Sequence, residues 1–120
     1  MERNWDTIRE ILLEAESIKP EAAIVLSNFD PDRAYEVSYH AELLEEAGLV
    51  HATILKAMGS GPTQFHIYRL TWQGHELLDS IRNESIWSKT KSTIADKGGV
   101  MTFELIKSVA IDLAKTAMGM

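Results

Sequence analysis

Positions 75–79 come close to a zinc-binding pattern. His75 is followed directly by Glu76, and Asp79 stands four positions after the histidine. A zinc protease helix carries two histidines at that spacing, and the glutamate after the first one is the general base. Asp79 replaces the second histidine here, and no third ligand is evident. We therefore predict no metal site and interpret Glu76 and Asp79 as acids that favour the positive end of a helix dipole.

The other residues capable of chemistry do not form a catalytic set. The chain contains no cysteine, which excludes a thiolate nucleophile, a disulfide framework and a cysteine metal site. Gly59, Ser60 and Gly61 are not followed by the Lys-Ser or Lys-Thr of a phosphate-binding loop. His51 and His66 would face each other across two strands, and we interpret them as a polar pair rather than a metal or pH-sensing pair. We predict a protein that is not an enzyme and needs no cofactor.

The N-terminal part of the chain predicts one helix and one ambiguous segment. Apolar residues recur at helical spacing over positions 5–18, and Lys19 before Pro20 ends this amphipathic helix. Positions 22–29 are apolar and partly β-branched. Periodicity does not separate a short strand from a poor helix at this length, and we favour the strand.

Asp30 and Pro31 form a strong helix start, and Gly48 is suited to end the helix, which we expect over 30–47. Projected at 100° per residue, one side of this helix is apolar and the other carries a polar, exposed stripe. The stripe consists of Tyr35, Ser38, Tyr39, Glu42, Glu45 and Glu46.

A hairpin follows this helix. We expect strands over 49–55 and 65–70, because both segments are rich in β-branched and aromatic residues. The loop between them contains two glycines and a proline. The strands should therefore pair antiparallel, with a mobile tip at 58–63.

Capping residues predict the C-terminal helices. Thr71 caps a helix that runs to about Arg82 or beyond, and the helical pattern continues to Asp96. Trp72 and Trp87 follow helical spacing, and we interpret them as core residues.

Thr102 caps a final helix with a wide apolar stripe. Small alanines allow another helix to approach closely, so the stripe packs either within the chain or on a second copy. We predict a homodimer through this helix, because two-fold dimers are the commonest oligomers. The stripe contains Phe103, Ile106, Val109, Ala110, Leu113 and Ala117.

The order of helix, short element, capped helix, hairpin and helix is that of a winged-helix domain. Positions 37–50 resemble the junction between recognition helix and wing in bacterial winged-helix repressors, and positions 69–78 resemble their step from wing to helix. We predict the α+β class, namely a winged helix-turn-helix with a β-hairpin wing and additional C-terminal helices. The chain would be a single domain, with its core over about 4–84 and a helical extension over about 85–120.

The whole chain is also similar to a narrower bacterial and prophage family, catalogued as domain of unknown function 2513. The matching blocks cover most of the length and lie at 38–49, 58–60, 69–75, 97–99 and 113–119. This resemblance implies the fold and a bacterial or mobile-element setting. It supplies no activity.

The winged-helix resemblance implies a small DNA-binding protein, similar to a transcriptional regulator, that contacts double-stranded DNA. Recognition helices meet base edges with their N-terminal half, where the tyrosines of the stripe lie. Residues at the helix start, in the hairpin loop and after it would hold the phosphates. The predicted DNA-binding residues are Arg33, Tyr35, Ser38, Tyr39, Lys56, Ser60, Thr63 and Arg69.

The charge distribution weighs against DNA binding. Residues 1–50 carry a net charge of −8 and residues 51–120 a net charge of +2, whereas affinity for nucleic acid depends mainly on Lys and Arg. Base readout uses Arg, Lys, Asn and Gln, and the stripe offers none of these. Its three glutamates repel phosphate.

The alternative is a non-catalytic protein–protein interaction module that retains the winged-helix fold without binding DNA. Exposed tyrosines suit a protein partner, because they give a large amphipathic contact area. One feature separates the two hypotheses. A DNA reader needs Arg33, Lys56 and Arg69 gathered on one face beside Tyr35 and Tyr39.

The overall composition is that of an ordinary globular chain, with 45% apolar and 25% charged residues among 120. No window approaches the roughly 18 uninterrupted apolar residues of a membrane span. The first residues lack the apolar run of a signal peptide. We expect a cytoplasmic protein without membrane association.

Overall fold

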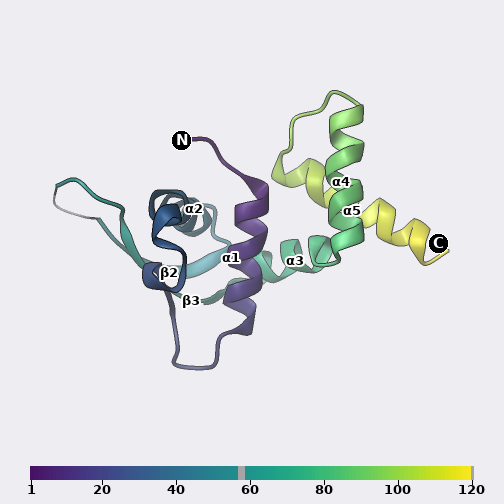
Figure 1. The fold of residues 1–120 in the computed structure, drawn as a ribbon. Coiled ribbons are helices and arrows are strands. Elements are labelled where there is room, and N and C mark those ends of the chain that lie inside the picture. Colours follow the sequence, from purple (N-terminus) through teal and green to yellow (C-terminus); the bar gives the residue numbers. More distant parts are fainter. Residues whose placement is uncertain (57–58, 120) are drawn as a thin grey trace. The chain divides into compact units, whose positions relative to one another are not determined.

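The computed structural model describes residues 1–56 and 59–119 and has the predicted mixed α+β character. Five α-helices, two short 3-10 turns and a three-stranded antiparallel sheet lie within these residues (Figure 1). The chain divides into two compact units, Met1–His75 and Glu76–Met120, and each is described by itself. The sequence places a division near residue 84, whereas the units divide within a helix. The single-domain organisation stays a prediction.

The first helix, α1, spans Trp5–Ser17, close to the expected 5–18. The Asn4 side chain accepts hydrogen bonds from the backbone N–H groups of Asp6 and Thr7, which caps the first turn. The expectation of an amphipathic helix is confirmed. The buried apolar residues of α1 are Trp5, Ile8, Ile11, Leu12 and Ala15.

The ambiguous segment 22–29 contains a strand of only two residues. Strand β1, Ile24–Val25, is followed directly by the 3-10 turn η1, Leu26–Asn28. Oδ1 of Asn28 accepts a hydrogen bond from the N–H of Val25 at 2.8 Å. Such side-chain bonds compete with extended pairing. The favoured strand is therefore right for two residues and wrong for the others.

The second helix, α2, spans Ala34–Glu46. Asp30 accepts a hydrogen bond from the N–H of Asp32 at 2.8 Å, but the first residues, Pro31–Arg33, form the 3-10 turn η2. The helix ends before Gly48, as expected. The φ angle of Gly48 is +73°, which favours glycine. The buried apolar residues of α2 are Val37, Ala41 and Leu44.

Strands β2, Val50–Leu55, and β3, Gln64–Leu70, pair antiparallel, which confirms the predicted hairpin. The strand order is β1-β3-β2, so β2 lies at an edge of the sheet. Phe65 and Ile67 of β3 face inward and are fully buried. Of the tip expected at 58–63, Met58 lies outside the described residues.

The prediction that His51 and His66 face each other is wrong. The register places His51 opposite Arg69 and His66 opposite Thr53. The reason is the loop, which sets the register from its own end by pairing Leu55 with Gln64. An irregularity between His51 and Ala52 then shifts the pairing by one more residue.

The two N-terminal helices cover different parts of the sheet. Helix α1 packs on β3, whereas α2 packs on both β2 and β3 (Figure 1). The two helices also contact each other. The β2 side of the sheet is therefore covered mainly by α2.

The start of helix α3, Trp72–Ile81, is held against the turn after α2. The N–H of Thr71 donates to the carbonyl oxygen of Leu49 at 3.0 Å. A Cβ atom added at Gly74 would collide with the same carbonyl oxygen. Glycine is therefore required at position 74 for this close approach.

The interpretation of Trp72 as a core residue is wrong, because its side chain is 76% exposed. Trp72 is the first residue of α3 and projects from the side opposite the buried Leu77, Leu78 and Ile81. Trp87 is 4% exposed, and its core assignment is confirmed.

Helices α4, Glu84–Asp96, and α5, Phe103–Ala117, form most of the second unit. The helical pattern expected to continue from α3 is interrupted, because Asn83 caps a new helix by accepting from the N–H of Ile86 at 3.0 Å. Thr102 caps α5 as predicted.

The apolar stripe of α5 turns toward α4, its packing partner in the same unit. Ile106 and Ala110 are buried, and Phe103, Val109 and Leu113 are half-buried. Packing within the chain therefore covers much of the surface predicted to dimerise. The homodimer stays a prediction.

Candidate functional site

The exposed side of α2 carries fewer of the predicted DNA contacts than its sequence projection indicates. Tyr35 is 58% exposed and Tyr39 is half-buried. The prediction that Ser38 belongs to the exposed stripe is wrong, because Ser38 is buried and its hydroxyl donates to the carbonyl oxygen of Tyr35 at 3.2 Å. Its assignment as a DNA-binding residue stays a prediction. The projection describes one helix alone, whereas α2 packs on both β2 and β3 in the fold.

Arg33, the predicted phosphate contact at the start of α2, is engaged by two carboxylates. Its guanidinium donates to both carboxylate oxygens of Glu10 at 2.8 and 2.9 Å, and to Glu36 at 2.9 Å. Hydrogen bonds to Glu10 and Glu36 raise the pKa of Arg33. The hydrogen bonds that Glu36 accepts from Arg33 and from the hydroxyl of Thr7 lower the pKa of Glu36 to about 2. Arg33 therefore ties α1 to α2.

His40 adds a second connection between these helices, which the sequence reasoning missed. The N–H of Asn4 donates to Nε2 of His40 at 2.7 Å, and Nδ1 lies 2.7 Å from the carbonyl oxygen of Glu36. With Nε2 as acceptor, Nδ1 is the donor, and the ring is the neutral tautomer. The sequence offered no signal beyond the position of His40 at the margin of the apolar side.

The hairpin end beside α2 is acidic despite its lysine. Nζ of Lys56 lies 3.2 Å from the carboxylate of Glu42. Glu45 and Glu46, exposed at the end of α2, complete an acidic group with Glu42. In the loop, Ser60 is exposed and Thr63 is half-buried. These two loop residues add no positive charge beside α2.

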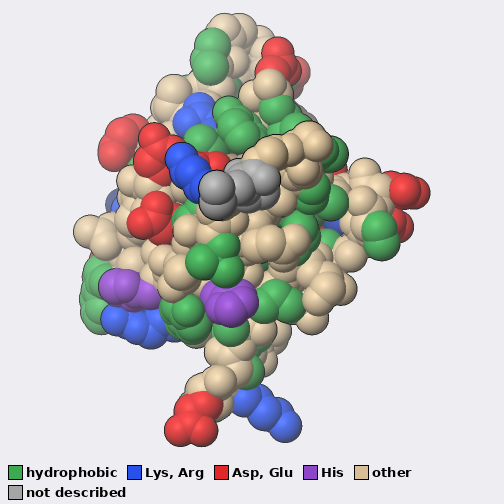
Figure 2. Space-filling view, turned by 90° about the vertical axis from the view of Figure 1, so that its left-hand side faces the viewer, with side chains coloured by type: hydrophobic (Ala, Val, Ile, Leu, Met, Phe, Trp, Pro, Cys, Tyr) green, Lys and Arg blue, Asp and Glu red, His purple; other side chains and the backbone are tan. Residues whose placement is uncertain are grey.

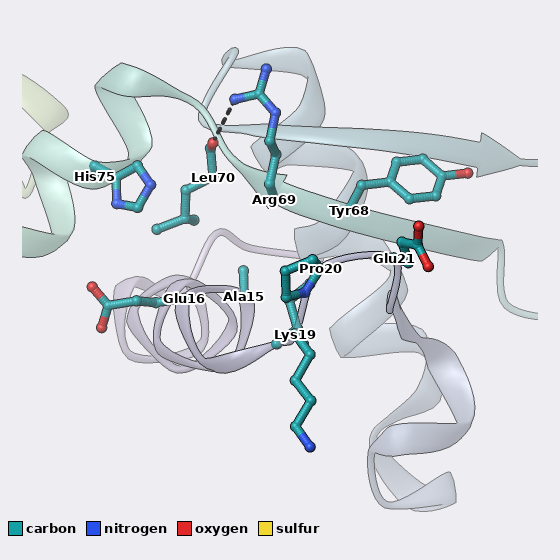
Figure 3. A pocket seen from close by; sticks show the side chains of 10 residues that line it. Ala15, Glu16, Lys19, Pro20, Glu21, Tyr68, Arg69, Leu70 and His75 are labelled. Carbon is teal, nitrogen blue, oxygen red and sulfur yellow. Dashed lines mark hydrogen bonds between the residues drawn. The ribbon is translucent and has the colours of Figure 1, made fainter.

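Arg69 lies on β3 beside a pocket of about 330 Å³ between the end of α1, the loop that follows it and β3. Its guanidinium donates to the carbonyl oxygen of Leu70 at 3.1 Å. Figure 3 shows Arg69 and Lys19 extending in opposite directions. Glu16 and Glu21 also line the pocket. Its charges are therefore mixed, and its cations do not converge on one ligand position.

A second surface lies on the solvent side of β2 and β3, and we name it the outer sheet face. Leu55 and Tyr68 are each 47% exposed there. The hydroxyl groups of Thr53 and Tyr68 lie 2.9 Å apart, and the rings of His66 and Tyr68 meet edge to face. The outer sheet face consists of His51, Thr53, Leu55, Gln64, His66 and Tyr68.

None of these six residues is an Asp, Glu, Lys or Arg, but Arg69 stands beside them on the same face, because the register places it opposite His51. Figure 2 shows histidine side chains beside hydrophobic ones in the lower half of the view, with a Lys or Arg side chain next to the left histidine, whereas acidic side chains gather higher up on the left. The first unit therefore presents one acidic helix surface and one surface of hydrophobic, hydroxyl and imidazole groups.

The zinc-like pattern on α3 is occupied by ion pairs. Asp79 accepts from Arg82 at 2.7 Å, and Glu76 lies 3.9 Å from Nζ of Lys107. Across residues 1–56 and 59–119, no three His, Asp or Glu side chains gather closely enough to hold a metal ion. In the same residues, no helix combines the length and apolar character needed to cross a membrane.

Comparison with known proteins shows which family the chain resembles. Residues 2–100 match the family described as "Hypothetical protein (DUF2513)". A Haemophilus influenzae protein named "Uncharacterized protein" is 40% identical over 111 residues, which cover 92% of each chain. Among solved structures, none matches the chain significantly.

Proposed function

The chain belongs to the DUF2513 family, and from this premise we propose that it is a non-catalytic protein-interaction module on a winged-helix core. Its partner binds the outer sheet face. The single observation that carries the proposal is the contrast between this partly apolar face, which adjoins Arg69, and the acidic side of α2, whose neighbouring cations are paired.

The winged-helix core is supported by the order of elements. Helix α1, strand β1, a short helical stretch, α2 and the β2–β3 hairpin follow one another as in that fold. The sheet order is β1-β3-β2, and α2 packs on both strands of the hairpin. The helix that usually supports the reading helix is reduced to the turns η1 and η2. The Haemophilus relative supports a bacterial origin.

Charge argues against α2 as a DNA-reading helix. Arg33 is held by Glu10 and Glu36, and Lys56 lies against Glu42. Arg69 stands on β3, opposite His51. The basic residues that a DNA reader would gather beside the tyrosines are thus distributed over separate elements. Phosphate affinity depends on such cations, and here acidic side chains neutralise two of the three.

The outer sheet face has the chemistry of a protein interface. Tyr68 combines a large ring with a hydroxyl group, and Leu55 adds apolar area beside it. Charged residues are depleted at interface centres, and aromatic residues are enriched there. Because the partner would bury Tyr68 and Leu55, these two residues are expected to contribute most of the affinity.

Two measurements test the proposal. A photo-crosslinking amino acid at position 68 should capture a defined protein, which is then purified and titrated, whereas the same probe at the exposed position 88 of α4 serves as the control. Fluorescence anisotropy with random duplex DNA at about 50 and 200 mM salt should show no binding, because electrostatic affinity is greatest at low salt. DNA binding that is lost on Tyr39→Ala would overturn the proposal.

DNA reading by α2 and the hairpin is the second candidate function, and the element order is the observation that favours it. The DNA contacts would come from Tyr35, Tyr39, Lys56 and Arg69. With so few cations, the slope of log affinity against log salt would be only about −2, at roughly −0.9 for each phosphate neutralised.

A homodimer through α5 is a separate prediction about assembly. Ile111 and Met118 remain exposed on α5 beside a groove of about 300 Å³ that also includes Ala114. Sedimentation of the unaltered chain at about 100 μM, far above typical dimer dissociation constants, tests it. A monomer at that concentration would end the prediction.

A further inference from the structure

We propose that the outer edge of β2 accepts an extended peptide segment of the partner as a fourth strand, and that this segment carries alternating basic residues. The inference rests on the proposed function, because it names the partner chemistry of that same region. It adds the recognition mode, which is strand addition to an exposed sheet edge.

Strand β2 is an open edge. It ends the strand order β1-β3-β2, and an edge strand presents unpaired N–H and C=O groups. Natural edges are commonly guarded by Lys or Pro. Residues 50–55 contain neither, and they contain no charged residue at all. The irregularity between His51 and Ala52, where Tyr68 of β3 is the extra residue, lies at the base of the hairpin, and it leaves Ala52 to Leu55 regularly paired with β3.

The inner face of the sheet is incompletely covered at this edge. Phe65 and Ile67 of β3 face inward and are fully buried. Ala52 and Ile54 of β2 face the same way and are only half-buried. A fourth strand beside β2 would cover the exposed flank of both side chains.

The acidic side of α2 lies over this edge. Glu36 and His40 face α1, since they bond to Thr7 and Asn4. At 100° per residue, Glu42 and Glu45 project from the opposite side of α2. Glu42 also reaches the end of β2, where it pairs with Lys56. A strand added at the edge would therefore run beneath carboxylates.

Charge selects the occupant. Residues 1–75 contain six Lys and Arg against twelve Asp and Glu, which gives a net charge of −6. Two copies paired through β2 would bring their α2 glutamates together, and like charges oppose that arrangement. A segment with Lys or Arg at every second position would instead direct its cations to Glu42 and Glu45. Its other side chains would extend the outer sheet face beside Thr53 and Leu55.

The test uses a fluorescein-labelled nine-residue peptide in which lysine alternates with threonine and valine. The control peptide has the same composition with the lysines grouped together. We expect the alternating peptide to bind the full chain at least about tenfold more tightly, because only alternation matches the two-residue period of a strand. Hydrogen exchange of the backbone amides in residues 50–55 should slow on binding. Equal affinity of both peptides, or protection confined to other residues, would overturn the proposal.

Matched protein variants locate the site. Glu42→Gln with Glu45→Gln should weaken peptide binding about fivefold, as expected for two partly exposed ion pairs. Glu2→Gln with Glu14→Gln makes the same charge change at exposed positions on and before α1 and should leave binding within about twofold. Thr53→Lys puts a charged lysine on the edge strand, which opposes pairing with another strand, and it should abolish peptide binding. Ser108→Lys on α5 should leave peptide binding unchanged. Equal effects within either pair would contradict the assigned site.

The outcome also separates this inference from the proposed function. If neither peptide binds but cross-linking at position 68 still captures a partner, strand addition is wrong and the outer sheet face remains the interaction surface. If the peptide binds at β2 and no partner is captured at position 68, the edge is the site and the outer sheet face is not. If both fail, both proposals are overturned.

Discussion

The exposed side of α2 and the outer sheet face belong to the same unit, yet they differ in the chemistry they offer to solvent. The helix presents Tyr35 among glutamates, and the cations beside it are held in ion pairs. The sheet presents Leu55 and Tyr68 among uncharged side chains, with Arg69 opposite His51 at its base. The difference shows that exposure of an aromatic side chain does not identify a binding surface. The charges around that side chain decide which partner can approach it.

The largest expected effect tests which of the two surfaces binds a protein. Leu55→Ala with Tyr68→Ala should weaken binding of the captured partner about a hundredfold, because two truncated interface anchors that each cost about 1.4 kcal/mol give a tenfold loss apiece. Tyr35→Ala is the matched control on α2 and should change affinity less than twofold. Isothermal titration of the purified partner measures both. Equal losses of affinity in both variants would show that the outer sheet face is not the preferred binding surface.

The next largest effect concerns the ion pairs that Arg33 forms with Glu10 and Glu36 at the start of α2. Arg33→Ala should lower the free energy of unfolding by about 1–2 kcal/mol, because the partly exposed Glu10 and Glu36 lose a shared, charge-assisted partner. Urea denaturation followed by circular dichroism measures this. Lys19→Ala, which removes an exposed cation, is the control and should stay within about 0.5 kcal/mol. An Arg33→Ala variant as stable as the control would show that the ion pairs of Arg33 do not stabilise the fold.

Acid should weaken the same connection. The pKa of Glu36 is lowered from 4.5 to about 2 in the folded chain. A depressed carboxyl pKa stabilises the folded state fully above the unfolded value, and this contribution is lost as the pH falls from about 4.5 toward 2. Because the side chain is partly exposed, we expect less than about 1 kcal/mol. Glu36→Gln should flatten this part of the stability profile, and an unchanged profile would contradict the prediction.

The smallest effect tests whether charge excludes DNA from α2. Replacing Glu42, Glu45 and Glu46 by Gln should produce weak binding to random duplex DNA at about 50 mM salt. Its salt slope should be about −1, because Lys56 loses its carboxylate partner and can neutralise one phosphate. Anisotropy at several salt concentrations measures the slope. If the unaltered chain binds DNA as tightly as this variant, the acidic surface is no barrier.

Local signals in the sequence predicted most of the secondary structure. Asp30 with Pro31 marked the start of the α2 region, and Gly48 marked its end, because capping and positive φ depend on neighbouring residues alone. Thr102 marked α5 for the same reason. The alternation of β2 and β3 predicted the hairpin. Asn83 shows the limit, because an unrecognised cap divided one expected helical pattern into α3 and α4.

The sequence by itself determined the family, the capped helices, the hairpin and the acidic balance of the N-terminal half. Only the tertiary structure decided what the candidate residues do. It buried Ser38, and it engaged Arg33 through Glu10, which lies 23 positions earlier in the chain. It also set His51 opposite Arg69. These outcomes depend on which elements pack together, and the periodicity of a single element carries no information about its neighbours in space.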